Sequence, residues 1–227
     1  MSPAPFAALC GNTSAILRGE VWRLFTAPFV HLVDGTVGHI VGVLLGLYFL
    51  APSFERTWGT RRLLGFLGLS VLIAYGLQVL IEALLILIGM GVLAAKLVPP
   101  YWLGGVPALE ALVIAFATGF PERQIRLFFV IPLGGRSLVL VTIAISLLFL
   151  VAGSLGPSGF IAPFGGMFAG WLLGSTPTLP RKLWLKFKLG RLDREARAEG
   201  LERRRRAQRS GLRVLPGGKD DPPTYLN

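Results

Sequence analysis

The sequence predicts an all-α membrane protein that crosses the bilayer several times and ends in a basic tail. Of its 227 residues, 53% are hydrophobic and only 15% are charged, and the mean hydropathy is +0.64. Soluble domains of this length are less apolar and more charged. In addition, five apolar segments approach the roughly 20 residues that a helix needs to span the hydrocarbon core. Together these observations predict a polytopic bundle of about five transmembrane helices.

The predicted spans, in chain order, are residues 36–54, 63–83, 103–118, 137–155 and 159–175. The second apolar run is too long for one ordinary span, because it continues to Val98 with Glu82 in its course. We expect a spanning helix to about residue 83. Residues 84–98 either extend this helix or form a segment at the membrane interface, and the Pro99-Pro100 pair stops it.

Basic residues are distributed unequally between the connections, which predicts orientation because Lys and Arg are retained on the cytoplasmic side. The connections after the first and third spans contain Arg56, Arg61, Arg62, Arg123, Arg126 and Arg136. The opposite side holds only Arg18, Arg23 and Lys96. We therefore expect the N-terminus outside and the C-terminus in the cytoplasm.

The segment after the last span is strongly basic. Residues 181–227 hold 14 of the 23 Lys and Arg and 6 of the 12 Asp and Glu, a net charge of +8. Its first part alternates charges with Leu, Trp and Phe, and Arg203–Arg206 follow. This pattern predicts a cytoplasmic tail, partly helical and then disordered, that binds anionic lipid. We expect no nucleic acid, because a tail anchored beside a membrane meets lipid first.

One block of the chain carries motifs in an order that is seldom assembled by chance. It reads GEVWRLFTAPFVH from Gly19, contains a second histidine, and ends in LYFLAPSFERTWG. These motifs resemble the rhomboid superfamily of intramembrane serine proteases. The matching residues are Trp22, Arg23, Phe29, His31, His39, Glu55, Arg56 and Gly59. The resemblance implies a membrane-surface loop opened by the Trp-Arg pair and a spanning helix closed by Glu-Arg-x-x-Gly.

The resemblance covers residues 19–175, which we predict to be a rhomboid-like membrane domain. The basic tail, residues 176–227, follows it. Bacterial rhomboids usually have one more span ahead of the Trp-Arg loop, and residues 1–18 are too short and too interrupted by Pro, Gly and polar residues to supply it. Either the first helix of the family is missing or the true start of the chain lies upstream. The resemblance also implies a bacterial inner membrane as the location.

The positions that carry catalysis in rhomboids lack the necessary groups here. The family's G-x-S-G is replaced by GGVP from Gly104, which places Val106 at the nucleophile. The A-H-x-G-G that supplies the general base reads APFGG, with Pro163 in place of the histidine, and Val43 replaces the asparagine that faces the oxyanion. Acyl transfer needs a nucleophile, a base and oxyanion donors. The resemblance therefore implies a scaffold without proteolytic chemistry, and no catalytic residue, cofactor or metal is expected.

A literal G-x-S-G does occur at Gly156–Gly159, around Ser158. It falls between the last two predicted spans, where Gly, Pro and Ser are typical of an ordinary turn. We interpret it as a turn. The alternative pairs Ser158 with His31 or His39, the two histidines of the chain.

Two residues are candidates for a remnant of the active-site cavity. Glu110 lies one helical turn after Val106 on the same face, and a carboxylate within a span is costly. In one interpretation, Glu110 lines a polar cavity with His39 and there contacts a client or exchanges a proton. In the other, it is a protonated carboxyl that is hydrogen-bonded to a neighbouring helix. His39 either retains a role in that cavity or forms a hydrogen bond at the end of its helix. Trp22 and a snorkelling Arg23 fit the membrane interface, and His31 anchors the loop.

Small residues predict how the helices associate in lipid, because they let backbones approach closely. The predicted contacts use Gly42 and Gly46 in the first span, and Gly166, Gly170 and Gly174 in the last. We conclude that the chain is a rhomboid-like pseudoprotease, not an enzyme, that binds transmembrane segments of client membrane proteins. Two alternatives remain: a divergent rhomboid serine protease that uses other residues, and a small transporter or channel subunit lined by Glu110.

Overall fold

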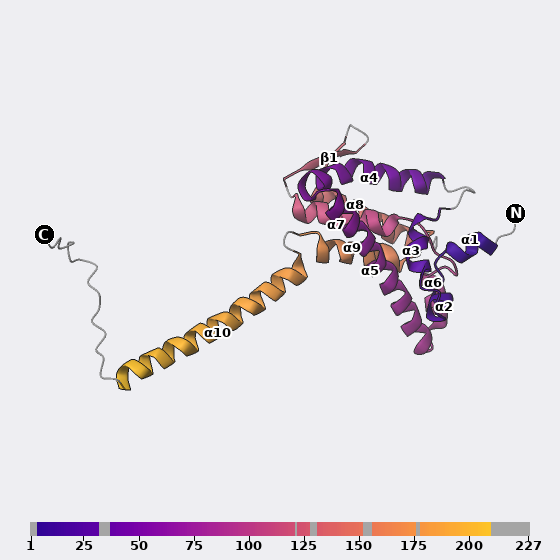
Figure 1. Ribbon diagram of the computed structural model, residues 1–227. Coiled ribbons are helices and arrows are strands. Elements are labelled where there is room, and N and C mark those ends of the chain that lie inside the picture. Colours follow the sequence, from indigo (N-terminus) through magenta and orange to yellow (C-terminus); the bar gives the residue numbers. More distant parts are fainter. Residues whose placement is uncertain are drawn as a thin grey trace. The chain divides into compact units, whose positions relative to one another are not determined.

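The computed structural model describes residues 4–31, 37–120, 122–127, 131–151, 156–175 and 178–209 and is mostly helical (Figure 1). The chain divides into two compact units, Met1–Pro180 and Arg181–Asn227. The first unit contains the predicted spans, and the second contains the basic tail.

Short helices form the N-terminal segment: α1 (Ala4–Leu9), α2 (Thr13–Leu17), α3 (Arg23–Thr26) and the 3-10 helix η1 (Ala27–Phe29). All are far shorter than the roughly 20 residues of a membrane span. The side-chain oxygen of Asn12 accepts a 2.8 Å hydrogen bond from the Ala15 N–H, as an N-cap residue does. Its amide nitrogen donates a 2.8 Å bond to the Pro100 carbonyl, so this segment is tied to a distant part of the chain.

Two long apolar helices follow, α4 (Val37–Trp58) and α5 (Thr60–Leu87). The single residue between them, Gly59, has φ +78, a backbone conformation that residues with a side chain rarely adopt. Across the turn, the Thr60 hydroxyl donates a 2.6 Å bond to the Glu55 carboxylate. Arg56 lies in the last turn of α4, where a positive charge is favourable. The Glu-Arg-x-x-Gly motif thus builds the connection between the two helices.

For residues 84–98 the sequence left open a helix extension or a separate segment, and the structure has elements of both. α5 continues to Leu87 and ends in a turn at Gly89, which has φ +81. A separate short helix, α6 (Gly91–Leu97), then ends before Pro99. The segment is therefore a short helix extension followed by an independent helix.

The remaining elements of the first unit are α7 (Val106–Gly119), β1 (Gln124–Leu127), β2 (Ile131–Gly134), α8 (Gly135–Val151) and α9 (Ile161–Leu173). The strands form an antiparallel hairpin in which Gln124 pairs with Gly134. From the sequence we expected only a connection between the third and fourth spans there, and no strands. By pairing, the two strands give each other's backbone N–H and C=O groups hydrogen-bond partners in a connection that also contains apolar residues.

The core of the bundle forms where α9 packs against both α5 and α7. An added Cβ at Gly165 would lie 2.8 Å from the Ala74 Cα of α5. One at Gly170 would lie 2.8 Å from the Ala111 Cα of α7. Large apolar side chains fill the space on either side, with Tyr75 and Trp102 in one cluster and others around Phe54 and Phe116. Backbones at such separations need glycine.

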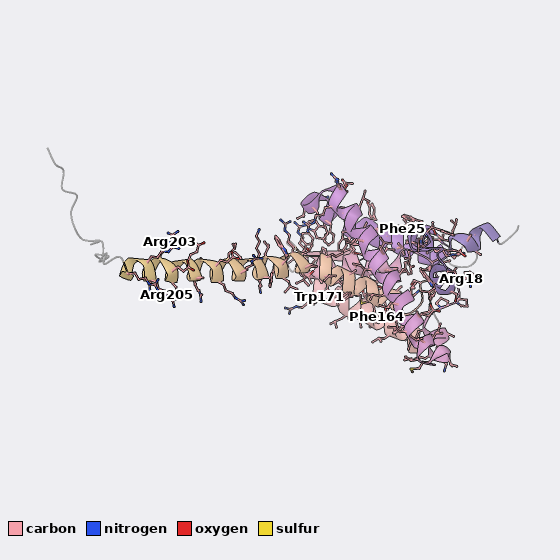
Figure 2. All side chains as sticks on the ribbon, turned by 60° about the horizontal axis from the view of Figure 1, so that its bottom comes forward. Arg18, Phe25, Phe164, Trp171, Arg203 and Arg205 are labelled. Atoms are coloured by element: carbon pink, nitrogen blue, oxygen red, sulfur yellow. The ribbon has the colours of Figure 1, made fainter. Side chains whose placement is uncertain are left out.

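Every predicted span forms a helix, which confirms the all-α polytopic architecture. Within the described ranges, Ile40–Trp58 and α5 are long and apolar enough to cross a membrane by themselves. α7, α8 and α9 are apolar but shorter, between 13 and 17 residues. Phe25 and Trp171 are exposed apolar side chains on this unit (Figure 2).

The described part of the second unit lies within one helix, α10 (Leu179–Arg209). Its apolar side chains near the start, among them Trp184 and Phe187, are exposed. Arg203 and Arg205 project from its later part (Figure 2). An ion pair of 2.8 Å joins Arg191 and Glu195 one turn apart.

Candidate functional site

The residues just before and at the start of α7, 102–107, form a junction on which several distant segments converge. We call it the α7 junction. Trp102 is fully buried and forms an antiparallel bridge with Gly11, with N···O distances of 2.8 and 3.0 Å. Its ring stacks on Tyr75 at a centroid distance of 4.4 Å and an interplanar angle of 22°. The N-terminal segment and α5 therefore fix this side of the junction.

Gly104 is held through both of its backbone polar groups. Its N–H donates a 2.9 Å bond to the Ala27 carbonyl, and its carbonyl accepts a 2.7 Å bond from the Tyr75 hydroxyl. Gly104 has φ +100, which favours glycine. The N–H of the preceding residue, Leu103, donates a 2.9 Å hydrogen bond to the Pro157 carbonyl. The polypeptide that leads into α7 is thus fixed from three directions.

Val43 of α4 lies against the beginning of α7. A Cβ added to Gly105 would be 3.1 Å from the Val43 Cγ1, and the Val43 side chain is only 5% exposed. Gly105 directly precedes Val106. The structure therefore places Val43 against the residue before Val106.

Pro163 of α9 is also buried at this end of the bundle. One turn further along α9, a Cβ at Gly166 would lie 2.8 Å from the Pro107 Cα. The N-terminal turns of α7 and α9 are therefore in contact. Pro107, in the first turn of α7, has no N–H to offer, which removes one of the donors that a helix start normally presents.

Gln78 of α5 completes this region and was not singled out from the sequence. It is fully buried, and its side-chain oxygen accepts a 3.0 Å bond from the Ala162 N–H at the start of α9. The N-cap residue of α9 makes no side-chain hydrogen bond, so Gln78 satisfies one of the free N–H groups at the start of this helix. Tyr75 and Gln78 are polar residues in an otherwise apolar run, and this was the signal that could have found them.

The chemistry available at the α7 junction follows from these side chains. Val43, Val106, Pro107 and Pro163 present carbon atoms only, so they supply no nucleophile, base or side-chain oxyanion donor. Across the described ranges, His, Cys, Asp and Glu form no group of three or more that could hold a metal ion.

Glu110 lies one turn into α7 from the junction. It is 9% exposed, and its Oε2 atom is buried with no hydrogen-bond partner in the described part of the chain. Buried polar atoms are normally paired, and an unpaired one is costly. The buried side-chain nitrogens of Trp102 and Gln78 also lack a partner among the described residues, so Glu110 is the carboxyl group among the unpaired polar groups at this end of the bundle.

The histidines and Ser158 occupy separate parts of the chain. His39 lies in the first turn of α4, and its side chain is outside the described residues. His31 follows η1, and its Nδ1 is 3.3 Å from the Phe29 carbonyl oxygen. Ser158 is 3% exposed in a turn at residues 157–160, where Gly159 has φ +77. This backbone agrees with the interpretation of Gly156–Gly159 as a turn.

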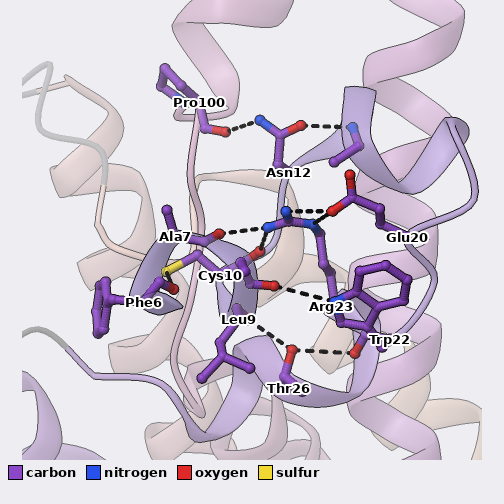
Figure 3. A network of polar contacts seen from close by, with 12 residues as sticks. Phe6, Ala7, Leu9, Cys10, Asn12, Glu20, Trp22, Arg23, Thr26 and Pro100 are labelled. Carbon is purple, nitrogen blue, oxygen red and sulfur yellow. Dashed lines mark hydrogen bonds and ion pairs between the residues drawn. The ribbon is translucent and has the colours of Figure 1, made fainter. Parts of the chain in front are cut away.

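The Trp-Arg pair organises the N-terminal segment (Figure 3). Arg23 is 7% exposed, and its guanidinium donates to the carbonyls of Ala7 at 2.6 Å and Cys10 at 2.7 Å, and to the Glu20 carboxylate. The Trp22 indole N–H donates a 3.3 Å bond to Ala8. We expected Arg23 to snorkel toward the membrane surface, and this was wrong. The three carbonyl and carboxylate acceptors hold the guanidinium inside the loop instead.

Cys10 is buried beside this network. Burial raises the pKa of its thiol, and the positive charge of Arg23 partly opposes that effect. The thiol lies 3.4 Å from the Phe6 carbonyl oxygen. A protonated, buried cysteine of this kind is chemically inert.

Glu82 lies at a second polar site, near the end of α5. The Thr13 hydroxyl donates to the Glu82 carboxylate at 2.5 Å, which ties α2 to α5. A pocket of about 290 Å³ adjoins this bond, lined by Asn12, Ser14 and several small apolar residues. Glu82 thus has a protein partner, in contrast to Glu110.

The helices and the α7 junction define a polytopic membrane protein whose centre is the close contact of α7 with α9. Residues 18–178 match the family model of the Rhomboid domain. This range is well over half of the chain, which therefore belongs to the rhomboid family. No curated protein and no solved structure was found to match the chain.

Proposed function

We propose that this protein is a rhomboid pseudoprotease, which binds transmembrane segments of client membrane proteins laterally and does not cleave them. One observation carries the proposal. Val43 lies against Gly105, the residue before Val106, and Pro163 is buried at the same end of the bundle. Apolar side chains at the positions that the resemblance assigns to catalysis support a scaffold without proteolytic chemistry.

The preserved packing supports a role for the fold itself. α9 contacts α5 and α7 through glycines at which an added Cβ would overlap the neighbouring backbone. Hydrogen bonds that involve the side chains of Tyr75 and Gln78 hold the starts of α7 and α9. A scaffold with these constraints, but without a nucleophile, is suited to binding rather than to acyl transfer.

A fluorophosphonate probe tests the absence of a serine nucleophile. The purified full-length protein in detergent is expected to remain unlabelled, while an active rhomboid treated in parallel is labelled. Labelling that disappears in Ser158→Ala would overturn the pseudoprotease proposal and establish the divergent protease instead. The buried turn position of Ser158 argues for the first outcome.

Copurification from native membranes tests the binding role. The expected result is a set of membrane proteins with single or few spans, retained after stringent washing and released when the bundle is unfolded. If only lipid copurifies, client binding is refuted. Solute or ion flux into vesicles that is abolished by Glu110→Gln would instead establish a transporter or channel subunit.

The basic tail fits a second contact, with anionic lipid at the cytoplasmic face of a bacterial inner membrane. Exposed Trp184 and Phe187 precede the arginine-rich turns of α10, an order that suits a helix lying in the headgroup region. Surface labelling of tail and loop cysteines in intact cells tests the orientation, since the tail is expected to be protected until the cells are opened.

A further inference from the structure

The side chains at the middle of α7 point in four directions, and three of these are filled by known neighbours. Successive residues of an α-helix are rotated by about 100°. Ala108 belongs to the core cluster shared with α5, Leu109 fits against Gly46 of α4, and Ala111 meets Gly170 of α9. The remaining direction, opposite α5 and between α4 and α9, belongs to Glu110.

α8 occupies the same side of α7. Ala117 lies seven residues after Glu110 and so on the same face, and its Cα is 2.6 Å from the position of an added Cβ at Gly135, the first residue of α8. In its described part α8 packs on α7 and β2 and makes no more than isolated contacts with α4 or α9. One side of this sector is therefore covered by a helix with a single close helical neighbour.

The inner face of α8 is partly polar. Its half-buried residues recur at helical spacing and are Leu138, Val139, Thr142, Ile143 and Ser146. Gly135 and Ala117 mark the level at which α8 and α7 touch. Thr142 lies seven residues along α8 from this level and Glu110 lies seven residues along α7, about 10 Å in each case. This spacing places Thr142 of α8 level with Glu110 of α7, whose Oε2 finds no partner in the described residues.

We propose that Glu110 is the specificity-determining residue of the client site and that it recognises a lysine or arginine within the client's transmembrane helix. This inference rests on the proposed function. A buried carboxyl without a partner and a basic residue in lipid are each costly, and pairing reduces both costs. Charge complementarity therefore selects clients with a basic residue about one turn below the end of the bundle where α7 starts.

Binding of synthetic helices tests the inference. The full-length protein is placed in neutral phosphatidylcholine vesicles, so that the tail adds no electrostatic attraction. Two dansyl-labelled peptides of roughly 20 Leu and Ala residues are titrated, one with a single Lys at the depth of Glu110 and one with Leu there. Energy transfer from the protein's tryptophans reports binding.

The Lys peptide is expected to bind about three- to thirtyfold more tightly than the Leu peptide, the range of measured interhelical polar contacts. Glu110→Gln keeps the shape but removes the charge, and it is expected to abolish this difference. Glu82→Gln is the matched control and leaves it unchanged, because Glu82 is already bonded to Thr13. Unfolding of each variant is measured to confirm an intact fold.

Two results overturn the inference, and they are distinguishable. If both peptides bind equally and Glu110→Gln has no effect, client binding stands but the basic-residue specificity is refuted. If neither peptide binds, the proposed function itself fails, and the inference fails with it.

Discussion

The Tyr75 hydroxyl donates a 2.7 Å hydrogen bond to the Gly104 carbonyl, joining the middle of α5 to the residues that lead into α7. Tyr75 is fully buried, and its ring stacks on Trp102. The same side chain therefore contributes both a polar and an aromatic contact to the α7 junction.

Tyr75→Phe keeps the ring contact and removes the hydrogen bond. Because the Gly104 carbonyl is then left buried and unpaired, we expect a loss of about 1–3 kcal/mol in the free energy of unfolding. Denaturation in detergent measures the change. Tyr48→Phe is the control, since Tyr48 is 69% exposed. Equal stability of the two variants would show that the Gly104 bond contributes nothing.

Gly170→Ala is expected to destabilise the bundle by about 1–3 kcal/mol, because the new methyl group would overlap Ala111 of α7. Gly42→Ala is the matched control within a helix. A Cβ there would meet no described atom within 4 Å. Its stability should be unchanged or slightly increased, since alanine favours helix over glycine. Denaturant titration of both variants provides the comparison, and a neutral Gly170→Ala would refute the close α7–α9 contact.

The sequence was sufficient to predict the five apolar spans as helices, but not the short N-terminal helices or the contacts that fix the helix ends. Apolar runs of span length and the small residues at Gly166, Gly170 and Gly174 are local signals, so they could be recognised directly. Gly46 likewise meets Leu109, whereas Gly42 has no described neighbour. A G-x-x-x-G pattern places two glycines on one face, but only the partner helix decides which of them is used.

The N-terminal network could not be predicted in the same way. Arg23 bonds to main-chain carbonyls of Ala7 and Cys10, and carbonyls carry no sequence signature. Proximity of an arginine to a predicted membrane surface favoured snorkelling instead. The pairing of β1 with β2 was missed for a related reason, because it depends on which two short segments of the chain meet.

Arg23→Lys should loosen the N-terminal loop although it conserves charge. A single ammonium group cannot reproduce a guanidinium that bonds two carbonyls and the Glu20 carboxylate at once. We expect faster alkylation of Cys10, which is 2% exposed in the native protein. Maleimide labelling rates in mild detergent measure this. Glu195→Gln, which removes an exposed ion pair of α10, serves as control and should not alter the rate.

Cys10 also predicts a dependence on pH. Burial raises the pKa of its thiol, so the unfolded chain ionises at lower pH than the folded one. The stabilising contribution is fully present below the usual thiol pKa of about 8.5 and is lost as the pH rises toward the folded value. Unfolding free energy should therefore fall above about pH 8.5, and less so in Cys10→Ala. An identical pH profile for the variant would contradict the raised pKa.

The last prediction concerns α10 and anionic lipid. A polarity-sensitive dye at Phe187→Cys, in a Cys10→Ala background, is expected to shift to the blue in nanodiscs with anionic lipid and much less in neutral ones. Each basic residue near a charged surface contributes about 1 kcal/mol, and the attraction decays over about 8 Å at physiological salt. The shift should therefore shrink at high ionic strength. Replacing Arg203–Arg206 with glutamine removes four of these charges and should weaken it as well. Equal emission in both lipids would mean that the exposed apolar side chains of α10 meet a protein surface rather than the membrane.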